Sequence, residues 1–452
     1  MKSRIRALAA PAALAAVLVM TGLAATGAAG AATTTEAPWV QFQGNAAHTG
    51  VNPNETILNT GNVSKLRLSS FVGTGADPLW SSPVVTNGNV YYTAHEAGLV
   101  VFPQAGCRNC FPSWIGQVGA QAIAAPAVVN GLAYVGSQTN RFDNHGRLNV
   151  FNANGCGSFS CAPLWQGLAG RDSIDTSSPA IADGVAYIGG GDGNLYAFNA
   201  TGCGHALCRP LWKAHVGNVI ASSPAVGDGM VYEAALDGHL EAFAAKGCGA
   251  TVCQPLWRAQ LATRRIAIAS PSVAGGQVFM TDGKFLNVFT AQGCGAAVCQ
   301  PIWRGPAHVS EGTPAVSGGV VYVDAQPNPE TRARVGALEA FDVHGCGQSI
   351  CHPLWTGINF NAGGESSPVV ANGVVYIGKS PASPSSGDAA VLSYPAAGCG
   401  KIRCQPLGLA ETGPEQFYLN STPAVANGSV YIASKDSITG DSGVYIFSLP
   451  KH

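Results

Sequence analysis

The stretch Ser177–Trp212, SSPAIADGVAYIGGGDGNLYAFNATGCGHALCRPLW, contains three short apolar runs and the start of a fourth. Asp183-Gly184 joins the first two runs, and such a dipeptide accepts a positive φ at both positions, as a type I′ β-hairpin requires. Asp192-Gly193 joins the second and third runs, and the fourth run begins with Pro-Leu-Trp. The stretch therefore predicts a small sheet of four antiparallel strands.

This unit occurs eight times in the chain. In each copy a proline follows Ser, Thr or Ala, a two-residue turn begins four residues later, and a run with the pattern apolar-x-x-aromatic comes next. A mean repeat of about 49 residues with antiparallel hairpins predicts a β-propeller, whereas a solenoid would have a shorter repeat and more often parallel strands. The prolines are Pro83, Pro126, Pro179, Pro224, Pro271, Pro314, Pro368 and Pro423, and the turns begin at Asn87, Asn130, Asp183, Asp228, Gly275, Gly318, Asn372 and Asn427.

The two ends of the repeat array predict how the ring closes. Lys65–Val72 stands where a fourth strand belongs, ahead of the first Ser-Ser-Pro, and the chain stops just after the eighth third strand. Pairing these two segments satisfies edges that are otherwise open to other chains. We therefore expect an all-β protein, with an N-terminal extension over residues 32–64. Residues 65–452 are expected to form one eight-bladed propeller of four-stranded antiparallel blades, closed by its N-terminal and C-terminal strands.

Residues 1–31 have the organisation of a secretory signal peptide. Lys2, Arg4 and Arg6 precede an apolar run over residues 7–23, and the small residues Ala29-Gly30-Ala31 follow. This order predicts cleavage near Ala31 and an exported, extracellular protein. An uncleaved membrane anchor is the alternative.

Charge composition limits the class of partner. The formal net charge is −1 and only 11% of residues are charged, whereas neutralising phosphate groups takes clustered Lys and Arg. We therefore expect no nucleic-acid or anionic-lipid partner. The later apolar runs are too short to span a bilayer, so no membrane span is expected after signal cleavage. We also expect a monomer.

Fourteen cysteines form seven local pairs, each between a third and a fourth strand. Export and the even number favour disulfide bonds that pin their turns, each stabilising by about 2 kcal/mol in the chain-entropy estimate. A zinc or thioredoxin-like redox site is the alternative, with Cys-x-x-Cys at Cys107 as its best match. The pairs are Cys107/Cys110, Cys156/Cys161, Cys203/Cys208, Cys248/Cys253, Cys294/Cys299, Cys346/Cys351 and Cys399/Cys404.

The repeat SSPAIADGVAYIGGGDGNLYAFNATG, and equally SSPVVANGVVYIG at Ser366–Gly378, resembles that of the pyrroloquinoline-quinone-type (quinoprotein-like) β-propellers. The opening WVQFQGNAAHTGVNP at Trp39–Pro53 looks like the segment that leads into the propeller in many such proteins. Enzymes of this superfamily hold the quinone and Ca²⁺ in the central channel with a catalytic Asp, and many use two adjacent cysteines. This chain has no Cys-Cys dipeptide, and it carries a Cys-Gly loop and Pro-Leu-Trp where the enzymes have a tryptophan-docking motif. The resemblance thus implies the fold and is compatible with non-catalytic relatives that act as protein-interaction scaffolds.

Two sets of repeated residues are interpreted as structural. Asp192, Asp237 and Asp282 each precede Gly in a hairpin and are expected to form turns, since no Asp-x-Asp-x-Asp calcium cluster is present. Tryptophans recur at the start of the fourth strand and are expected to pack between blades. This series is Trp114, Trp165, Trp212, Trp257, Trp303 and Trp355. Trp80, outside it, is the better candidate to face the channel.

The fourth-to-first and second-to-third connections vary most between copies, and loops on a rigid scaffold usually carry binding. We therefore predict an exported, non-catalytic ligand-binding or scaffold module without a cofactor. The alternatives are an alcohol or sugar dehydrogenase that uses pyrroloquinoline quinone and Ca²⁺, and a cell-surface carbohydrate-binding propeller. The candidate ligand-binding residues on this rim are Arg171, Asp172, Arg264, Arg265, Glu311, Glu365 and Glu415, together with Trp80.

Overall fold

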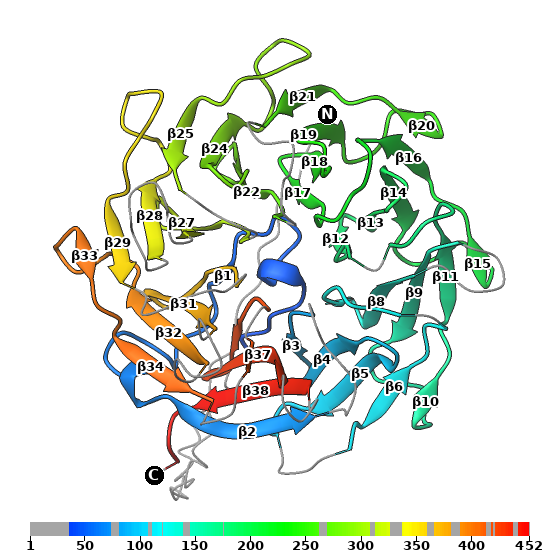
Figure 1. Ribbon diagram of the computed structural model, residues 1–452. Helices are drawn as coiled ribbons and strands as arrows, with labels where there is room; N and C mark the ends of the chain where they lie inside the picture. The colour runs from blue at the N-terminus through cyan, green and yellow to red at the C-terminus, as the bar shows by residue number, and fades with distance from the viewer. Residues whose placement is uncertain are drawn as a thin grey trace, which may run out of the picture. The chain divides into compact units, whose positions relative to one another are not determined.

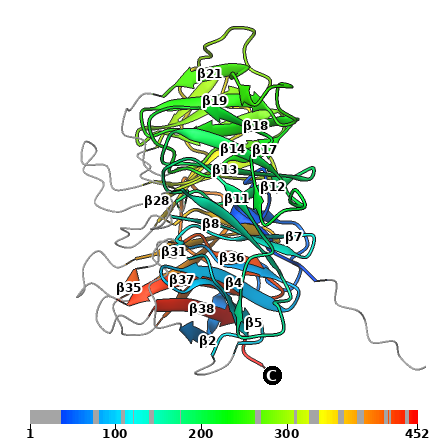
Figure 2. The ribbon, with the colours of Figure 1, turned by 90° about the vertical axis from the view of Figure 1, so that its right-hand side faces the viewer.

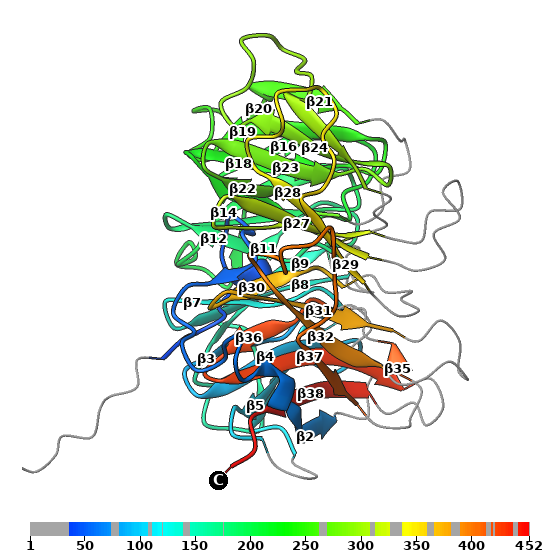
Figure 3. The ribbon, with the colours of Figure 1, turned by 90° about the vertical axis from the view of Figure 1, so that its left-hand side faces the viewer.

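Eight β-sheets surround one axis in a computed structural model of the chain (Figure 1). Figures 2 and 3 show the same ring edge-on from its two sides. Each innermost strand contacts the innermost strands of both neighbouring sheets, and the last contacts the first, so the ring is closed. The structure describes residues 36–73, 81–106, 111–119, 121–138, 145–174, 176–261, 269–307, 312–325, 337–358, 366–380, 389–412, 417–418, 421–436 and 442–451.

Every sheet contains the four antiparallel strands that the repeat predicts. The innermost strands are β3 (Val84–Thr86), β7 (Ala127–Val129), β12 (Ala180–Ala182), β17 (Ala225–Gly227), β22 (Ser272–Ala274), β26 (Ala315–Ser317), β30 (Val369–Ala371) and β36 (Ala424–Ala426). The second strands are β4 (Asn89–Ala94), β8 (Leu132–Ser137), β13 (Val185–Gly189), β18 (Met230–Ala234), β23 (Gln277–Thr281), β27 (Val320–Ala325), β31 (Val374–Lys379) and β37 (Ser429–Asp436).

The outer half of each sheet follows the same order. The third strands are β5 (Gly98–Pro103), β9 (Arg147–Asn152), β14 (Asn194–Asn199), β19 (His239–Ala244), β24 (Phe285–Thr290), β28 (Ala337–Asp342), β32 (Ala390–Pro395) and β38 (Ser442–Ser448). The fourth strands are β6 (Trp114–Gly116), β11 (Trp165–Leu168), β16 (Trp212–His215), β21 (Trp257–Gln260), β25 (Trp303–Pro306), β29 (Trp355–Ile358), β34 (Gly408–Glu411) and β2 (Arg67–Gly73). Two residues, β35 (Phe417–Tyr418), pair with β37 in the last sheet.

The hairpins between first and second strands have the predicted turn geometry. Asp183 and Gly184 have φ values of 47° and 78°, and Gly275 and Gly276 have 57° and 75°. Both central residues are thus in the left-handed region, which a type I′ turn requires and which Asn, Asp and Gly tolerate best. The repeated dipeptide therefore fixes the register of the two inner strands.

The ring closes as the sequence predicts. β2, from the N-terminal side of the array, pairs antiparallel with β38 at the C-terminal end, with Val72 opposite Val444. This pairing supplies the fourth strand of the eighth blade and joins segments that are far apart in the chain (Figure 1). No helix of the described residues is long and apolar enough to cross a membrane.

Several blades have a fifth strand that the four-stranded prediction did not include. It is a two-residue piece of the cysteine loop of the following blade, and it runs parallel to the fourth strand. In one case the amide of Gln166 donates to the carbonyl of Ala206, 2.8 Å away. These short strands are β10 (Ser160–Cys161), β15 (Leu207–Cys208), β20 (Val252–Cys253) and β33 (Arg403–Cys404). Each cysteine loop of this kind therefore fastens its own blade to the preceding one.

The cysteine loops of the fifth and sixth blades make the same contact through a single bridge. Val298 pairs parallel with Arg258 of the fourth blade, and Ile350 pairs parallel with Arg304 of the fifth. The amide of Cys299 donates to Arg258 O, and the amide of Cys351 donates to Arg304 O, both at 2.8 Å. These two loops therefore also join neighbouring blades, although each pairs too briefly to form a strand.

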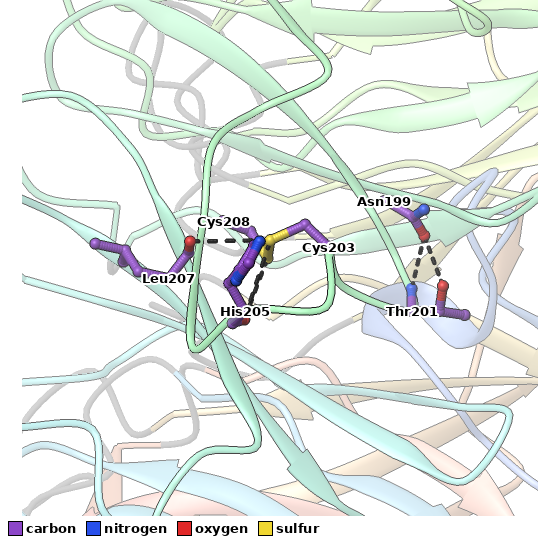
Figure 4. Close-up of a disulfide and its surroundings, with 6 residues drawn as sticks. All are labelled: Asn199, Thr201, Cys203, His205, Leu207 and Cys208. Carbon is purple, nitrogen blue, oxygen red and sulfur yellow. Dashed lines mark hydrogen bonds between the residues drawn. A yellow bond between two sulfur atoms is a disulfide. The ribbon is translucent and has the colours of Figure 1, made fainter.

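Six of the seven predicted disulfide bonds fall on described residues and all six are formed. Figure 4 shows the bond between Cys203 and Cys208, whose Cα atoms are 5.7 Å apart. The turn just before it is held by Asn199, whose Oδ1 accepts hydrogen bonds from the amide and the hydroxyl of Thr201. The other five bonds are Cys156–Cys161, Cys248–Cys253, Cys294–Cys299, Cys346–Cys351 and Cys399–Cys404, whereas Cys107 and Cys110 lie outside the described residues.

The second cysteine of each described pair is part of the apolar core, a role that the prediction of turn-pinning disulfide bonds did not include. Cys299 is 3% exposed and packs with Trp257 and Phe289, and Cys351 is also 3% exposed and packs with Trp303 and Phe341. Each of these clusters combines side chains of two neighbouring blades, because a disulfide sulfur is apolar enough to be buried with aromatic rings. Cys161, Cys208, Cys253 and Cys404 are buried in the same way. These cysteines therefore contribute to the blade interfaces and are not surface binding residues.

The tryptophans of the fourth strands pack between blades, the role that the sequence predicts. Trp212 is buried, and its ring centroid lies 6.3 Å from that of Phe243 in the next blade. It also lies against Gly247, the residue just before the first cysteine of the next blade's loop. The Cys-Gly loop and the Trp therefore dock on one another across each such interface.

Candidate functional site

The N-terminal extension follows the inner wall of the ring instead of standing apart from it, with the 3₁₀ turn η1 (Phe42–Gly44) at the centre of Figure 1. In seven blades the residue two positions after the repeat proline donates its amide to this segment. The acceptors are Trp39 O for Val85, Val40 O for Val128, Gln41 Oε1 for Ile181, Ala46 O for Val226, Ala47 O for Val273, Thr49 O for Val316 and Gly50 O for Val370, all at 2.7–2.8 Å. At the eighth blade Asn52 Nδ2 donates to Val425 O, 2.8 Å away.

Residues 39–52, which we call the axial segment, thus satisfy the open edge of every innermost strand. An unpaired strand edge is costly inside a protein and a template for aggregation outside it. Two residues of the segment, β1 (Val51–Asn52), pair with β30 as a regular parallel strand. The axial position of the ring is therefore occupied by the chain's own backbone along the inner strands.

Side chains of the axial segment add polar contacts to the ring. Gln41 Nε2 donates to Ile181 O at 3.2 Å, and Gln43 Nε2 donates to Thr313 O at 3.3 Å. His48 Nδ1 donates to Pro271 O at 3.1 Å, and burial lowers the pKa of His48 to about 4. The imidazole is therefore neutral at physiological pH and serves as a hydrogen-bond donor.

The Ser-Ser-Pro element forms a second ring of hydrogen bonds. The first serine binds its own blade, as when Ser177 Oγ accepts the amide of Gly189 at 3.0 Å. The residue before the proline binds the next blade, because its amide donates to the hydroxyl oxygen of the equivalent residue there. The pairs, donor first, are Ala125 to Ser178, Ser178 to Ser223, Ser223 to Ser270, Ser270 to Thr313, Thr313 to Ser367 and Thr422 to Ser82. These hydroxyls are buried, so we assign them to ring assembly.

Burial raises the pKa values of four described carboxyl groups near the second-to-third turns. These turns lie on the rim that also carries the fourth-to-first connections, here called the connection rim. Burial raises the pKa of Glu233 to about 8 and the pKa values of Glu241 and Glu339 to about 7. Burial also raises the pKa of Asp324 well above its usual range, and the nearby Glu339 charge adds to this. Groups with such raised pKa values are uncommon outside functional sites, so they are candidates for function.

The structure describes two of the predicted rim residues. Arg171 and Asp172 are exposed on the connection between β11 and β12. Asp172 Oδ1 accepts the amide of Ser173 at 2.8 Å, and Ser173 O in turn accepts the amide of Gly191 in the β13–β14 turn. The pair is thus held on the connection rim by backbone contacts while its side chains face solvent. The other predicted residues, Trp80, Arg264, Arg265, Glu311, Glu365 and Glu415, lie outside the described residues.

The three turn aspartates have the structural role predicted for them. Asp192 Oδ1 accepts the amide of Asn194, and Asp282 Oδ1 accepts the amides of Lys284 and Phe285. Asp237 also orders the connection between β16 and β17, because its Oδ2 accepts a hydrogen bond from the amide of Asn218 at 3.1 Å. These carboxylates therefore order the connection rim.

The enzymes that this chain resembles hold a calcium ion, so we searched the described residues for a cluster of metal-binding side chains. Calcium takes six to eight oxygens that converge on one point, yet no three His, Cys, Asp or Glu side chains of the described part of the chain lie close enough to hold a metal ion. The carboxyls whose pKa values burial raises are instead divided between the fourth blade and the sixth.

Comparison with known proteins agrees with the fold. Residues 145–293 match a family model of pyrroloquinoline-quinone-type repeats, described as outer membrane protein assembly factor BamB. No curated protein matches the chain in sequence. Together with the eight-bladed ring, the match agrees with the pyrroloquinoline-quinone-type (quinoprotein-like) β-propeller repeat that the sequence predicted.

Solved structures of two kinds share the architecture. Quinohemoprotein alcohol dehydrogenase from Comamonas testosteroni is 13% identical, with a TM-score of 0.65 over 92% of this chain and 82% of that one. A europium-containing methanol dehydrogenase is 13% identical, with a TM-score of 0.65 over 91% and 98%. BamB from Moraxella catarrhalis is also 13% identical, with a TM-score of 0.57 over 86% and 98%. At this identity the likeness concerns the fold alone.

The sequence reasoning missed two features of the site. The resemblance singled out Trp39–Pro53, but nothing in its composition indicates contact with every blade. The buried acids were also missed, although a signal was available: Glu233 and Glu339 stand at strand positions where most other copies of the repeat carry uncharged residues. Aligning the eight copies column by column finds both acids.

Proposed function

We propose that this protein is an exported, non-catalytic β-propeller that serves as a ligand-binding or protein-interaction scaffold, with the connection rim as its binding surface. The observation that carries this proposal is the axial segment. Its backbone bonds to the inner strands where the superfamily's enzymes keep their cofactor, and it ties all eight blades to one another. We therefore assign ligand binding to the loops that this ring carries.

Export is supported by the leader pattern of residues 1–31 and by the disulfide bonds, which persist in oxidising compartments. The opposite rim carries the first-to-second hairpins and the cysteine loops, and we call it the cysteine rim. Its loops are nearly uniform from blade to blade. The connection rim differs in every copy, and selective recognition needs such asymmetry.

Charge gives the binding surface its chemistry. Arg171 and Asp172 present adjacent charges of opposite sign to solvent on the connection rim. Opposite charges side by side suit a polar partner that itself carries both signs, such as a protein surface, better than a polyanion. We therefore assign a protein partner first.

Site-specific photo-crosslinking in the producing cells tests this assignment. A photoreactive residue at Arg171 or Asp172 is expected to capture a defined partner, and the same residue at Leu256, which is exposed on the cysteine rim, serves as the matched control. Capture at Leu256 alone, or at none of the three positions, contradicts the proposal.

A dehydrogenase that uses pyrroloquinoline quinone and Ca²⁺ is the second candidate, because two of the similar structures are dehydrogenases. The purified protein is titrated with quinone and Ca²⁺ and assayed with an artificial dye acceptor and simple alcohols or sugars. We expect neither a bound chromophore nor turnover. A stoichiometric chromophore with dye reduction would replace the scaffold assignment by the enzymatic one.

A further inference from the structure

The eight copies of the repeat allow one facing pair of residues to be compared in every blade. The pair joins the second and third strands near the connection rim. In order around the ring it reads Tyr92/Val100, Val135/Asn149, Ile188/Tyr196, Glu233/Glu241, Met280/Asn287, Val323/Glu339, Ile377/Leu392 and Ile432/Tyr445. Only the fourth blade has two carboxylic acids there. Since seven blades fold without them, the fold does not require this pair.

The surroundings of the pair are dry. Glu233 is fully buried and Glu241 is 5% exposed. Glu233 Oε1 accepts hydrogen bonds from Ser222 Oγ and from the amide of Ala234, whereas neither Glu233 Oε2 nor Glu241 Oε2 has a hydrogen-bond partner among the described residues. A buried polar atom without a partner is costly when neutral and far more costly when charged.

The third blade forms an apolar wall against Glu233. A Cβ atom on Gly189 would lie 3.1 Å from Glu233 Oε2 and 2.3 Å from Ile220 Cγ2. Ile220 belongs to the connection between β16 and β17, which lies on the connection rim. Ionisation of Glu233 therefore places a charge at the contact between this connection and the third blade.

Few charged groups face the pair. Arg258 on β21 stands opposite Glu241 in the register and lowers its pKa, while Asp237 in the β18–β19 turn raises it. His239 beside Asp237 binds that carboxylate through Nδ1 at 3.0 Å. On the third-blade side the facing ionisable group is Tyr187, whose hydroxyl donates to Ala245 O at 2.6 Å. None of these groups pairs with Glu233.

We propose that Glu233 and Glu241 form a proton-dependent latch between the third and fourth blades, closed when both carboxyl groups are protonated and opened at the β16–β17 connection when they ionise. The direction of the pH effect follows from the difference in proton binding between the closed and open states. The closed state binds protons more tightly than the open state, in which the carboxyls reach water, so raising the pH favours opening. The window runs from the ordinary pKa of 4.5 up to about 8, the pKa that burial gives Glu233.

Hydrogen exchange read by mass spectrometry at pH 5.5, 6.5 and 7.5 tests the latch on the purified full chain. After correction for intrinsic exchange rates, the opening constant for residues 216–224 is expected to rise about tenfold per pH unit for each carboxyl that is protonated in the closed state and ionised in the open state. The peptide over residues 421–434 of the eighth blade, where the facing pair is Ile432/Tyr445, is the internal reference and is expected to show no such slope.

Variants separate the latch from general loosening. Glu233→Gln, an uncharged isostere, is expected to reduce the pH slope to the share that Glu241 contributes, and Glu233→Ile, which copies the third blade, provides a second neutral variant if the first does not fold. Glu241→Asn, which copies the fifth blade, is expected to reduce the slope. Glu96→Gln, at an exposed turn of the first blade, is the matched control and keeps the wild-type slope. A flat wild-type profile, or a slope that keeps its full wild-type value in both Glu233 variants, overturns the proposal.

Discussion

A Cβ atom on Gly247 would lie 2.6 Å from Cδ1 of Trp212, so the third blade's outer tryptophan rests directly on the backbone of the fourth blade's cysteine loop. The same contact joins Trp165 to Gly202 and Trp257 to Gly293, each glycine having a positive φ. The indole of Trp257 also donates from Nε1 to Ala291 O at 3.0 Å. The blade interfaces are thus made of one repeated docking contact.

Gly247→Ala tests this docking contact, and Gly249→Ala in the same loop is the matched control. Gly247 and Gly249 have the same φ of 78°, but a Cβ atom on Gly249 meets nothing within 4 Å. Placing alanine in the left-handed region costs about 1–2 kcal/mol at either position, and overpacking adds about 1–3 kcal/mol at Gly247 alone. Urea unfolding is expected to show the larger loss for Gly247→Ala. Equal losses in the two variants would mean that the indole contact carries no stability.

The double substitution Cys203→Ser with Cys208→Ser tests whether the disulfide bond stabilises the pairing of its loop with the neighbouring blade. Loss of the loop constraint is expected to cost about 2 kcal/mol. The fifth strand of the second blade should then fray, so amide exchange at Gln166, which donates to Ala206 O, should accelerate. Exchange at Val128, bonded to the axial segment, is the internal control. Unchanged exchange at Gln166 would show that the strand pairing does not need the disulfide bond.

Asn52→Ala tests the axial segment at the eighth blade. The Asn52 amide group donates to Ala37 O and to Val425 O, at 3.0 and 2.8 Å, and both contacts are buried. Leaving these carbonyls without a donor is expected to cost about 1–3 kcal/mol each. Asn54→Ala, two residues further on at an exposed position, is the control and should change the free energy of unfolding by less than about 0.5 kcal/mol. A similar value for both variants would remove the segment's claimed role in closing the ring.

The sequence predicted the ring because its signals are local. A positive φ at Asp183-Gly184 and an aromatic residue at the end of each third strand act within one unit, so repetition makes them visible. The axial segment acts over long range: Trp39 and Asn52 bond to residues 46 and 373 positions away. Such partners leave no spacing pattern in the chain.

One departure from the repeat would have indicated where the N-terminal segment packs against the ring. The seventh blade has Gly408 where six other blades have a Trp. The reason is the 3₁₀ turn η2 (Val63–Lys65), which packs there in place of a cysteine loop. A Cβ atom on Gly408 would lie 2.8 Å from Val63 O. The missing Trp thus marks where the N-terminal segment closes the ring.

Global stability is expected to fall as the pH rises from about 5 to 8. Glu233, Glu241 and Glu339 have raised pKa values of about 8, 7 and 7, so the unfolded state releases protons that the folded state keeps. Stability from these groups is complete below 4.5 and is lost as the pH rises through their folded pKa values. His48, with its pKa lowered to about 4, acts in the opposite sense, but only below about pH 6.5. Among the described groups with shifted pKa values, the buried acids therefore set the slope between pH 6.5 and 8.

Denaturant unfolding at pH 6.5 and 7.5 measures this slope. Glu233 by itself contributes about 1.4 kcal/mol of stability lost per pH unit, and Glu233→Gln should remove that share while leaving the m-value unchanged. His48→Gln should leave the slope intact in this range, because the folded and unfolded states both hold a mostly neutral His48 above pH 6.5. A free energy of unfolding that rises with pH over this interval would mean that the buried carboxyls are ionised in the folded protein.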